Sequence, residues 1–207
     1  MLRERILSLA TEMFQTFGLK AVSMDDIAKK VGISKRTLYE IFSSKDELLT
    51  CCIRNIQEKS VSEIETLVKD SSKDFVEMIL GILFILTKDM RKVNTLFFVD
   101  LDRYNFRSAF ELNEVKTTEK RNKFVAMLQR GVDEGYIIPD IDLELTADIF
   151  FSKNMHLTTL LRRTSQVAVV DLVNNLFLLH FRGISTLKGV ERIDTLVAEM
   201  KKSINKQ

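Results

Sequence analysis

Proline and glycine are scarce in this sequence, which has one proline and seven glycines in 207 residues. Sandwiches and barrels use these residues at many tight turns, so the shortage excludes folds built from numerous short strands. We therefore predict an all-α fold class. At this length the chain has room for a small N-terminal module and one larger helical domain.

Long apolar segments are also missing. The longest uncharged stretches, Met78–Thr87 and Leu172–Phe181, have ten residues each, whereas a membrane-spanning helix needs about 20. The N-terminal segment MLRERILSLATEM contains Glu4 and Glu12 and lacks the apolar core of a signal peptide. We therefore expect a cytoplasmic protein without a membrane partner.

The motifs of common enzyme classes are absent as well. The sequence contains no P-loop, no G-x-G-x-x-G and no G-x-S-x-G. Its two histidines, His156 and His180, lack the Cys or carboxylate spacing of a metal site. We therefore predict no enzymatic activity, no cofactor and no metal.

Cysteine is limited to the adjacent pair Cys51 and Cys52. Successive side chains diverge on a helix, so we expect no disulfide between them. Small buried or half-buried thiols are the favoured interpretation, and a redox role stays open.

Charge of one sign does not dominate either. The sequence has 31 Lys and Arg against 29 Asp and Glu, and residues 1–50 hold eight against seven. Any attraction to nucleic acid must therefore come from where the charges lie and not from their sum.

What the sequence does contain is a helix-turn-helix pattern between Ser23 and Leu49. Ser23-x-x-Asp26 and Ser44-x-x-Glu47 are capping-box patterns, Ser34 can cap the helix between them, and Gly32 can take positive φ at the turn. The side chains expected to point inward are Ile27, Ala28, Val31, Leu38, Ile41 and Phe42. An amphipathic helix over residues 2–17, with Ile6, Ala10, Met13, Phe14 and Phe17 on one stripe, supports the pair and ends at Gly18.

Basic and hydroxyl side chains gather at the start of the second helix of this unit. A recognition helix places such residues against base edges in the major groove, while its flanks contact phosphates. Arg36 suits guanine and Thr37 suits a thymine methyl, whereas Lys35, Tyr39 and Lys45 suit phosphates. The predicted DNA-binding residues are Ser23, Ser34, Lys35, Arg36, Thr37, Tyr39 and Lys45. The alternative is a small helical bundle with a solvated basic edge.

The segment AVSMDDIAKKVGISKRTLYEIFSSKDELL resembles the DNA-binding domain of the TetR family of one-component transcriptional regulators. The matching positions are Val22-Ser23, Ile27-Ala28, Gly32-Ile33-Ser34, Thr37-Leu38-Tyr39, Phe42, Ser44-Lys45 and Glu47-Leu48-Leu49. Arg36 departs from the pattern, because many members carry glycine or a small residue there, so base preference cannot be taken from relatives. The resemblance implies a ligand-responsive repressor that binds a palindromic operator as a homodimer.

Beyond this segment a long helix is expected from Lys45 to Lys69, ended by residues 70–74. Further helices are expected over residues 75–91, 93–104, 108–134, 143–163, 167–187 and 190–204. The predicted domains are a helix-turn-helix DNA-binding domain over residues 1–46 and an effector-binding and dimerisation domain over residues 47–207.

The second domain is rich in phenylalanine, with nine of the 14 phenylalanines between residues 75 and 151. These rings predict a pocket for a small apolar or amphipathic effector. Its candidate residues are Phe84, Phe97, Phe98, Tyr104, Phe110, Phe124 and His156. For each phenylalanine the alternative is ordinary core packing, and for His156 it is a core histidine with its hydrogen bonds satisfied.

The helix expected over residues 167–187 is apolar on more than one side, so it must be buried on more than one side. A second copy of the chain, packed as a four-helix bundle, would cover one of these sides. The candidate interface residues are Phe150, Met155, Leu172, Leu176, Leu179 and Phe181. The alternative is that the last helix covers this side within one chain.

Together these patterns predict a sequence-specific DNA-binding regulator that reads DNA through residues 34–45. The alternative function is a helical ligand- or protein-binding module that does not bind DNA specifically. The near-neutral net charge is the main support for that alternative.

Overall fold

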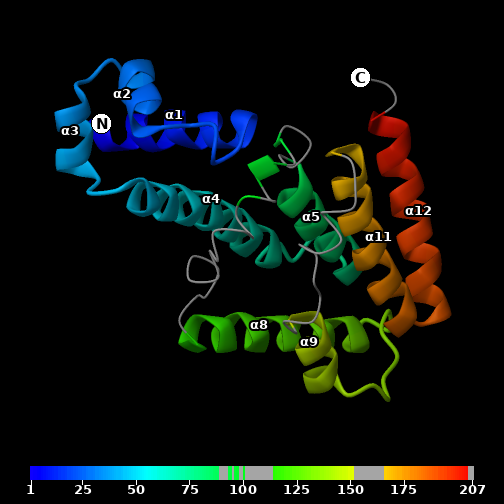
Figure 1. Ribbon diagram of the computed structural model, residues 1–207. Coiled ribbons are helices and arrows are strands. Elements are labelled where there is room, and N and C mark those ends of the chain that lie inside the picture. The colour runs from blue at the N-terminus through cyan, green and yellow to red at the C-terminus, as the bar shows by residue number, and fades with distance from the viewer. Residues whose placement is uncertain (89–92, 95, 98–99, 101–113, 152–165, 205–207) are drawn as a thin grey trace. The chain divides into compact units, whose positions relative to one another are not determined.

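The computed structural model describes residues 1–88, 93–94, 96–97, 100, 114–151 and 166–204, and these residues form nine helices (Figure 1). The helices are α1 (Leu2–Phe17), α2 (Met24–Val31), α3 (Lys35–Ile41), α4 (Lys45–Val68), α5 (Phe75–Thr87), α8 (Glu114–Asp133), α9 (Leu143–Phe151), α11 (Gln166–Ile184) and α12 (Leu187–Ile204). An isolated antiparallel bridge joins Ile137 to Ser185. The predicted all-α class is confirmed.

The chain divides into two compact units. Unit 1 holds residues 1–63 together with the described residues of 88–100 and residues 166–170. Unit 2 holds residues 64–87, 114–151 and 171–204. The division falls inside α4, and a functional boundary between residues 46 and 47 stays a prediction.

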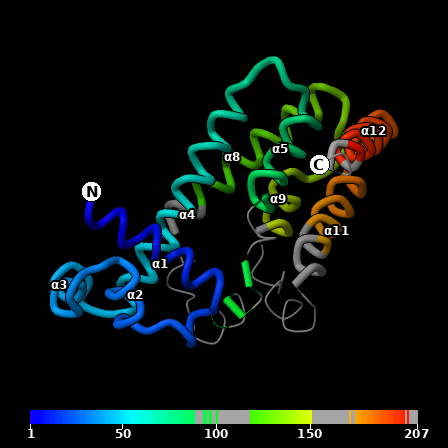
Figure 2. Tube along the Cα trace, turned by 90° about the horizontal axis from the view of Figure 1, so that it is seen from above, coloured from blue at the N-terminus to red at the C-terminus, as the bar shows by residue number. Residues whose placement is uncertain are grey.

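Unit 1 is built on α1, α2, α3 and most of α4, and α1, α2 and α3 lie together in both views (Figures 1 and 2). Ile6, Ala10 and Phe14 of the predicted α1 stripe are buried, Met13 is half-buried, and Phe17 is exposed. The buried side chains that meet them are Leu19, Ile27, Ala28, Val31, Leu38, Phe42, Leu48 and Cys52. This cluster holds the short helices in place, as the apolar pattern predicted.

A segment about 80 residues further along the chain forms hydrogen bonds with the C-terminal end of α1. The Asn94 amide donates to the Gln15 carbonyl at 2.7 Å, and its side-chain Nδ2 donates to the Thr16 carbonyl at 3.1 Å. Asp100 accepts from the Lys20 amide at 3.0 Å, and Val93 and Phe97 join the buried cluster of unit 1. Unpaired carbonyls at the helix end thus find donors from outside the N-terminal segment.

Unit 2 is built around aromatic rings carried by α5, α8, α9 and α11. Phe124 stacks on Phe150 with ring centroids 4.6 Å apart, and Phe177 lies 4.6 Å from Phe181. Offset and tilted ring pairs of this kind add to the stability gained from burial. Arg121 of α8 pairs with Glu144 and with Asp148 (2.5 Å) of α9, which fixes these two helices to each other.

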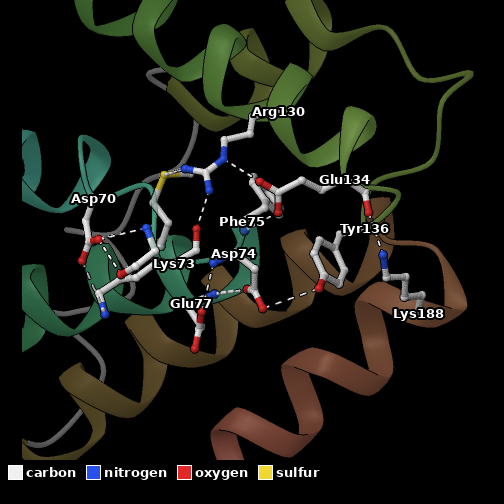
Figure 3. A network of polar contacts seen from close by, with 11 residues as sticks. Asp70, Lys73, Asp74, Phe75, Glu77, Arg130, Glu134, Tyr136 and Lys188 are labelled. Carbon is white, nitrogen blue, oxygen red and sulfur yellow. Dashed lines mark hydrogen bonds and ion pairs between the residues drawn. The ribbon is translucent and has the colours of Figure 1, made fainter.

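The turn after α4 ends in a capping box on α5 (Figure 3). Asp74 Oδ1 accepts from the Glu77 amide at 2.8 Å, and Glu77 accepts from the Asp74 amide at 2.9 Å. Arg192 of α12 reaches both carboxylates, at 2.8 Å and 3.2 Å. The predicted break after α4 is confirmed, and it is an ordered turn held by α12.

A second arginine ties the same turn to α8. Arg130 pairs with Glu134 at 2.6 Å and donates to the Lys73 carbonyl, and Glu134 accepts from the Phe75 amide at 2.7 Å (Figure 3). Lys188 of α12 donates to the Glu134 carbonyl at 2.7 Å. The start of α5, the end of α8 and the start of α12 are therefore joined by one polar network, and α11 and α12 lie side by side (Figures 1 and 2).

Over the part of the chain that the structure describes, none of the helices combines the length and apolar character needed to cross a bilayer.

Candidate nucleic-acid interface

Three N-caps position α3 and its neighbours, and all three serines were predicted from the sequence. The Ser23 side chain accepts from the Asp26 amide at 3.2 Å and Asp26 accepts from the Ser23 amide at 2.9 Å, which completes the capping box. Ser34 Oγ accepts from the Thr37 amide at 3.0 Å. Gly32 has φ 79°, the left-handed conformation that the turn between α2 and α3 requires.

The N-cap of α4 differs from the prediction in one of its two hydrogen-bonding interactions. Ser44 Oγ accepts from the Glu47 amide at 3.1 Å, as expected. The Glu47 carboxylate, however, accepts from the amide (2.7 Å) and hydroxyl (2.6 Å) of Ser43 instead of reaching back to Ser44. The predicted capping box is therefore shifted by one residue on its carboxylate side, because Ser43 offers two donors.

The outer face of α3 carries the side chains that the sequence assigned to DNA. Lys35, Arg36 and Tyr39 are exposed, and the Arg36 side chain keeps 89% of its accessible surface. Thr37 is half-buried, with its hydroxyl 2.8 Å from Ser34 Oγ. Leu38 points the other way and is fully buried. One side of α3 is thus fixed in the core while the other is open to a partner.

Each cation of α3 already has a carboxylate partner. Lys35 Nζ lies 2.8 Å from Asp25 Oδ1 on α2, and this hydrogen bond raises the pKa of Lys35. Arg36 Nε donates to Glu40 Oε1 at 3.0 Å, one turn along the same helix. The basic residues of this face were predicted from the sequence, but their pairing with carboxylates was not.

Two of the predicted DNA-binding residues are engaged inside the protein. The Ser23 hydroxyl donates to Asp26 at 2.5 Å, and its hydrogen bonds lower the pKa of that carboxyl. Lys45 Nζ donates to the Leu19 carbonyl at 2.5 Å and lies 5.8 Å from the centre of the Phe14 ring, and burial lowers the pKa of its ammonium. A phosphate contact by Lys45 would require this hydrogen bond to break.

The cysteines lie behind the interface, on α4. Cys52 is buried and its thiol donates to the Leu7 carbonyl at 3.7 Å, while Cys51 is half-buried and accepts from Arg3 at 3.3 Å. Burial raises the pKa of Cys52 to about 11. Both are free thiols, in keeping with the absence of a disulfide that the helix geometry predicted.

The described residues among those predicted for an effector pocket belong to different parts of the chain. Phe97 belongs to the buried cluster of unit 1, whereas Phe124 is buried in unit 2 and Phe84 of α5 is 53% exposed. Phe98, Tyr104, Phe110 and His156 lie outside the described residues. Local spacing placed these rings on helices correctly where they are described, but it could not assign them to separate units.

Unit 2 contains a small apolar cavity of about 10 Å³ that is partly open to solvent. Its lining comes from α5, α11 and α12, and consists of Phe75, Val76, Ile79, Leu80, Phe177, Leu178, Phe181 and Ile193. Ligand pockets usually measure about 300–1,000 Å³. In the conformation described, the cavity has room for about one water molecule and is far too small for an effector.

The residues predicted for a dimer interface also separate. Phe181 is 2% exposed and lies in the core of unit 2, so the structure corrects its assignment to a subunit surface. Phe150 is half-buried among the same rings, and Leu176 is half-buried as well. Leu179 is 67% exposed, whereas Met155 and the side chain of Leu172 lie outside the described residues.

His180 is a residue whose surroundings the sequence did not reveal. Its ring lies 5.4 Å from Phe150 and 5.5 Å from Phe181, and its buried Nε2 has no hydrogen-bond partner. Burial lowers the pKa of this imidazole. Among the described residues, His, Cys, Asp and Glu form no group of three or more that could hold a metal.

With this geometry in place, comparison with known proteins identifies the module. The model of the bacterial regulatory proteins of the tetR family matches residues 6–50, which span α1, the helix-turn-helix and the start of α4. Residues 6–50 form a DNA-binding domain of the TetR family.

Curated relatives extend the likeness beyond the matched segment. The HTH-type transcriptional repressor KstR2 of Mycolicibacterium smegmatis is 28% identical over 164 residues, covering 69% of this chain and 71% of the relative. The HTH-type transcriptional regulator UidR of Escherichia coli is 29% identical over 147 residues, covering 70% and 74%. The solved structure of the ketosteroid transcriptional regulator KstR2 of Mycobacterium tuberculosis has the same fold, with a TM-score of 0.58 at 23% identity over 89% of this chain and 95% of that one.

The chain, with its TetR-type DNA-binding domain, is therefore a DNA-binding transcriptional regulator. This finding favours the regulator over the alternative of a helical binding module. Its relatives are regulators of transcription.

Proposed function

We propose that this regulator is a homodimeric repressor that binds a palindromic operator through the exposed face of α3 and responds to a small apolar or amphipathic effector. The observation that carries the proposal is the exposed Arg36 beside Thr37, on a helix whose opposite side is buried and whose start is capped by Ser34. Such a helix can enter the major groove without rearranging its own core. The repressor KstR2 among its relatives supports the direction of regulation.

The proposed operator follows from two-fold symmetry. Two copies of α3 in successive major grooves require half-sites about one helical turn apart, roughly 34–36 Å. The apolar residues Leu145, Ile149 and Leu179 on α9 and α11 of unit 2 are each more than half exposed, which supports a second copy as their partner. The dimer would thereby fix the distance between the two reading helices.

The proposed effector acts on unit 2. Support comes from its aromatic interior and from the apolar cavity beside Phe177 and Ile193, which would have to widen to admit a ligand. An effector that prefers one conformation of the dimer shifts the population toward it and changes operator affinity accordingly. Thermal-shift screening of apolar and amphipathic small molecules tests this part, and a screen in which none stabilises the protein contradicts it.

Selection of bound fragments from sheared genomic DNA tests the proposal as a whole. Purified protein should enrich a palindrome with half-sites about one turn apart, and light scattering should give the mass of a dimer. Uniform recovery of fragments at every salt concentration would contradict operator binding by the protein alone. A monomeric mass would contradict the palindromic arrangement.

A further inference from the structure

The two cations on the outer face of α3 are neutralised by neighbouring carboxylates in the absence of DNA. Lys35 is held by Asp25 at 2.8 Å, and Arg36 is held by Glu40 at 3.0 Å. The side chains of Lys35, Arg36 and Glu40 stay largely exposed, whereas that of Asp25 is half-buried at 49%. The face that would meet DNA therefore presents equal numbers of positive and negative side chains from these four residues.

This arrangement reduces the attraction of the surface for a polyanion. Sequence-independent affinity comes from lysines and arginines that neutralise phosphates and release counterions. A carboxylate that already holds the guanidinium competes with phosphate for it, and it also repels phosphate oxygens brought close to it. Glu40 thus weakens the contact that any DNA sequence could offer to Arg36.

We propose that Glu40 is a specificity-determining residue. Its ion pair with Arg36 keeps the guanidinium from the phosphates of non-specific DNA and breaks only when Arg36 contacts a guanine edge. The inference rests on the proposed DNA-reading role of α3. Exposed pairs of this kind are weak, and the order Arg then Glu along a helix is the less favourable one. A bidentate contact with guanine O6 and N7 is strong enough to replace such a pair, whereas a single phosphate contact gains little over it.

Glu40 then has its own partner in the specific complex. A carboxylate that loses its arginine can accept from the N4 amino group of cytosine, which is the base-edge donor that acidic side chains suit. Arg36 and Glu40 lie one turn apart on the same exposed face, so they can contact neighbouring bases. Asp25 and Lys35 repeat the neutralisation on the α2 side of the same surface.

The test measures salt dependence with the Glu40→Gln variant, which keeps the size of the side chain and removes its charge. The probes are a fluorescent scrambled duplex and a duplex selected from a random library by the unchanged protein. On the scrambled duplex we expect Glu40→Gln to bind about two- to fivefold more tightly at low salt. The slope of log K against log salt should steepen by about 0.9, because Arg36 gains one phosphate.

Two further variants separate this mechanism from a general charge effect. Glu58→Gln removes one negative charge from an exposed position on α4, about 20 Å along the helix from Lys45, and should leave the slope unchanged. In the Arg36→Ala background, Glu40→Gln should no longer steepen the slope. A steepening that persists there, or that Glu58→Gln reproduces, overturns the proposal.

The selected duplex distinguishes failure of this inference from failure of the proposed function. The ratio of specific to non-specific affinity should fall in Glu40→Gln, with the preference for cytosine beside the Arg36 guanine relaxed. If Glu40→Gln changes the affinity for both duplexes by the same factor, the proposed role of Glu40 is wrong, although operator binding itself is not contradicted. If the unchanged protein enriches no sequence, the proposed function fails, and the scrambled-duplex slopes still decide whether Glu40 restrains Arg36.

Discussion

Arg36 and Lys35 are adjacent on α3 and should affect DNA binding in different ways. We expect Arg36→Ala to cost about 1–3 kcal/mol on the operator and to relax preference at one base position, because it removes a base contact. Lys35→Ala should weaken all duplexes similarly and reduce the salt slope by about 0.9, because it removes a phosphate contact. Binding titrations with operator variants check both. Loss of affinity without altered preference in both variants would contradict this division of roles.

His180 should make stability depend on pH near neutrality. Its burial beside Phe150 lowers the imidazole pKa from the ordinary 6.5. At pH values between this lowered pKa and about 6.5, the unfolded chain binds more protons than the folded one. The free energy of unfolding is therefore highest above this window and falls as the pH decreases through it. Urea unfolding of the protein and of His180→Phe at several pH values tests this. The variant should lose this dependence.

The two thiols of α4 should differ in reactivity. Cys52 is buried with a pKa raised to about 11, so almost none of it is thiolate at pH 7.5, whereas Cys51 is half-buried. Alkylation of the folded protein, followed by mass spectrometry, should modify Cys51 first and Cys52 only in denaturant. The Cys51→Ser variant should remain unlabelled while folded. Equal labelling rates at both positions would show that the packing around Cys52 opens readily.

At the scale of helices, two glycines of unit 2 give opposite predictions for the same substitution. A Cβ at Gly189 would lie 2.2 Å from the Tyr136 carbonyl oxygen, whereas one at Gly183 would meet nothing within 4 Å. Gly189→Ala must push α12 away and should lower the free energy of unfolding by about 1–3 kcal/mol. Gly183→Ala should raise it by up to about 1 kcal/mol, since alanine favours a helix. Thermal or urea unfolding of the two variants tests these predictions. Equal effects of the two substitutions on the free energy of unfolding would contradict the close approach of Gly189 to the Tyr136 carbonyl.

The features that the sequence predicted best are the individual helices of the helix-turn-helix. Serine caps and Gly32 define α2 and α3 because the determining contacts lie within four residues of each other, which a sequence displays directly. Lys45 shows the limit of such reasoning. Its ammonium donates to Leu19, 26 residues earlier, and nothing in the local pattern distinguishes such a lysine from one directed at a phosphate. The spacing of Arg36 and Glu40 allows an ion pair on a helix, but its formation and its bearing on DNA follow only from a structure in which both side chains face outward.

At the scale of the whole molecule, each unit has its own buried cluster, and the two clusters share no residue. We therefore expect the units to respond separately to local damage. In hydrogen exchange monitored by mass spectrometry, Gly189→Ala should speed exchange in α5 and α11 while leaving the buried part of α1 as slow as before. Acceleration of both by the same factor would indicate a single cooperative unit.

Assignment to units was what the sequence could not supply. Phe97 and Phe124 are indistinguishable by composition and helical spacing, yet they belong to different clusters. Likewise, the contacts of Asn94 and Asp100 with the end of α1 join segments about 80 residues apart. Such long-range pairs are fixed by tertiary packing, which periodicity does not encode.

The continuity of α4 has a consequence for protein engineering. Its first half buries Leu48 and Ile53 in unit 1, and Ile64 and Leu67 pack against the cluster of unit 2, all within one 24-residue helix. A chimeric biosensor that joins this DNA-reading module to a relative's sensing module must therefore be spliced inside a helix and not in a loop. One inserted residue would rotate everything after the junction by about 100°, whereas seven would nearly restore the phase. The register of α4, more than sequence identity between the donors, should decide which hybrids still respond to their ligand.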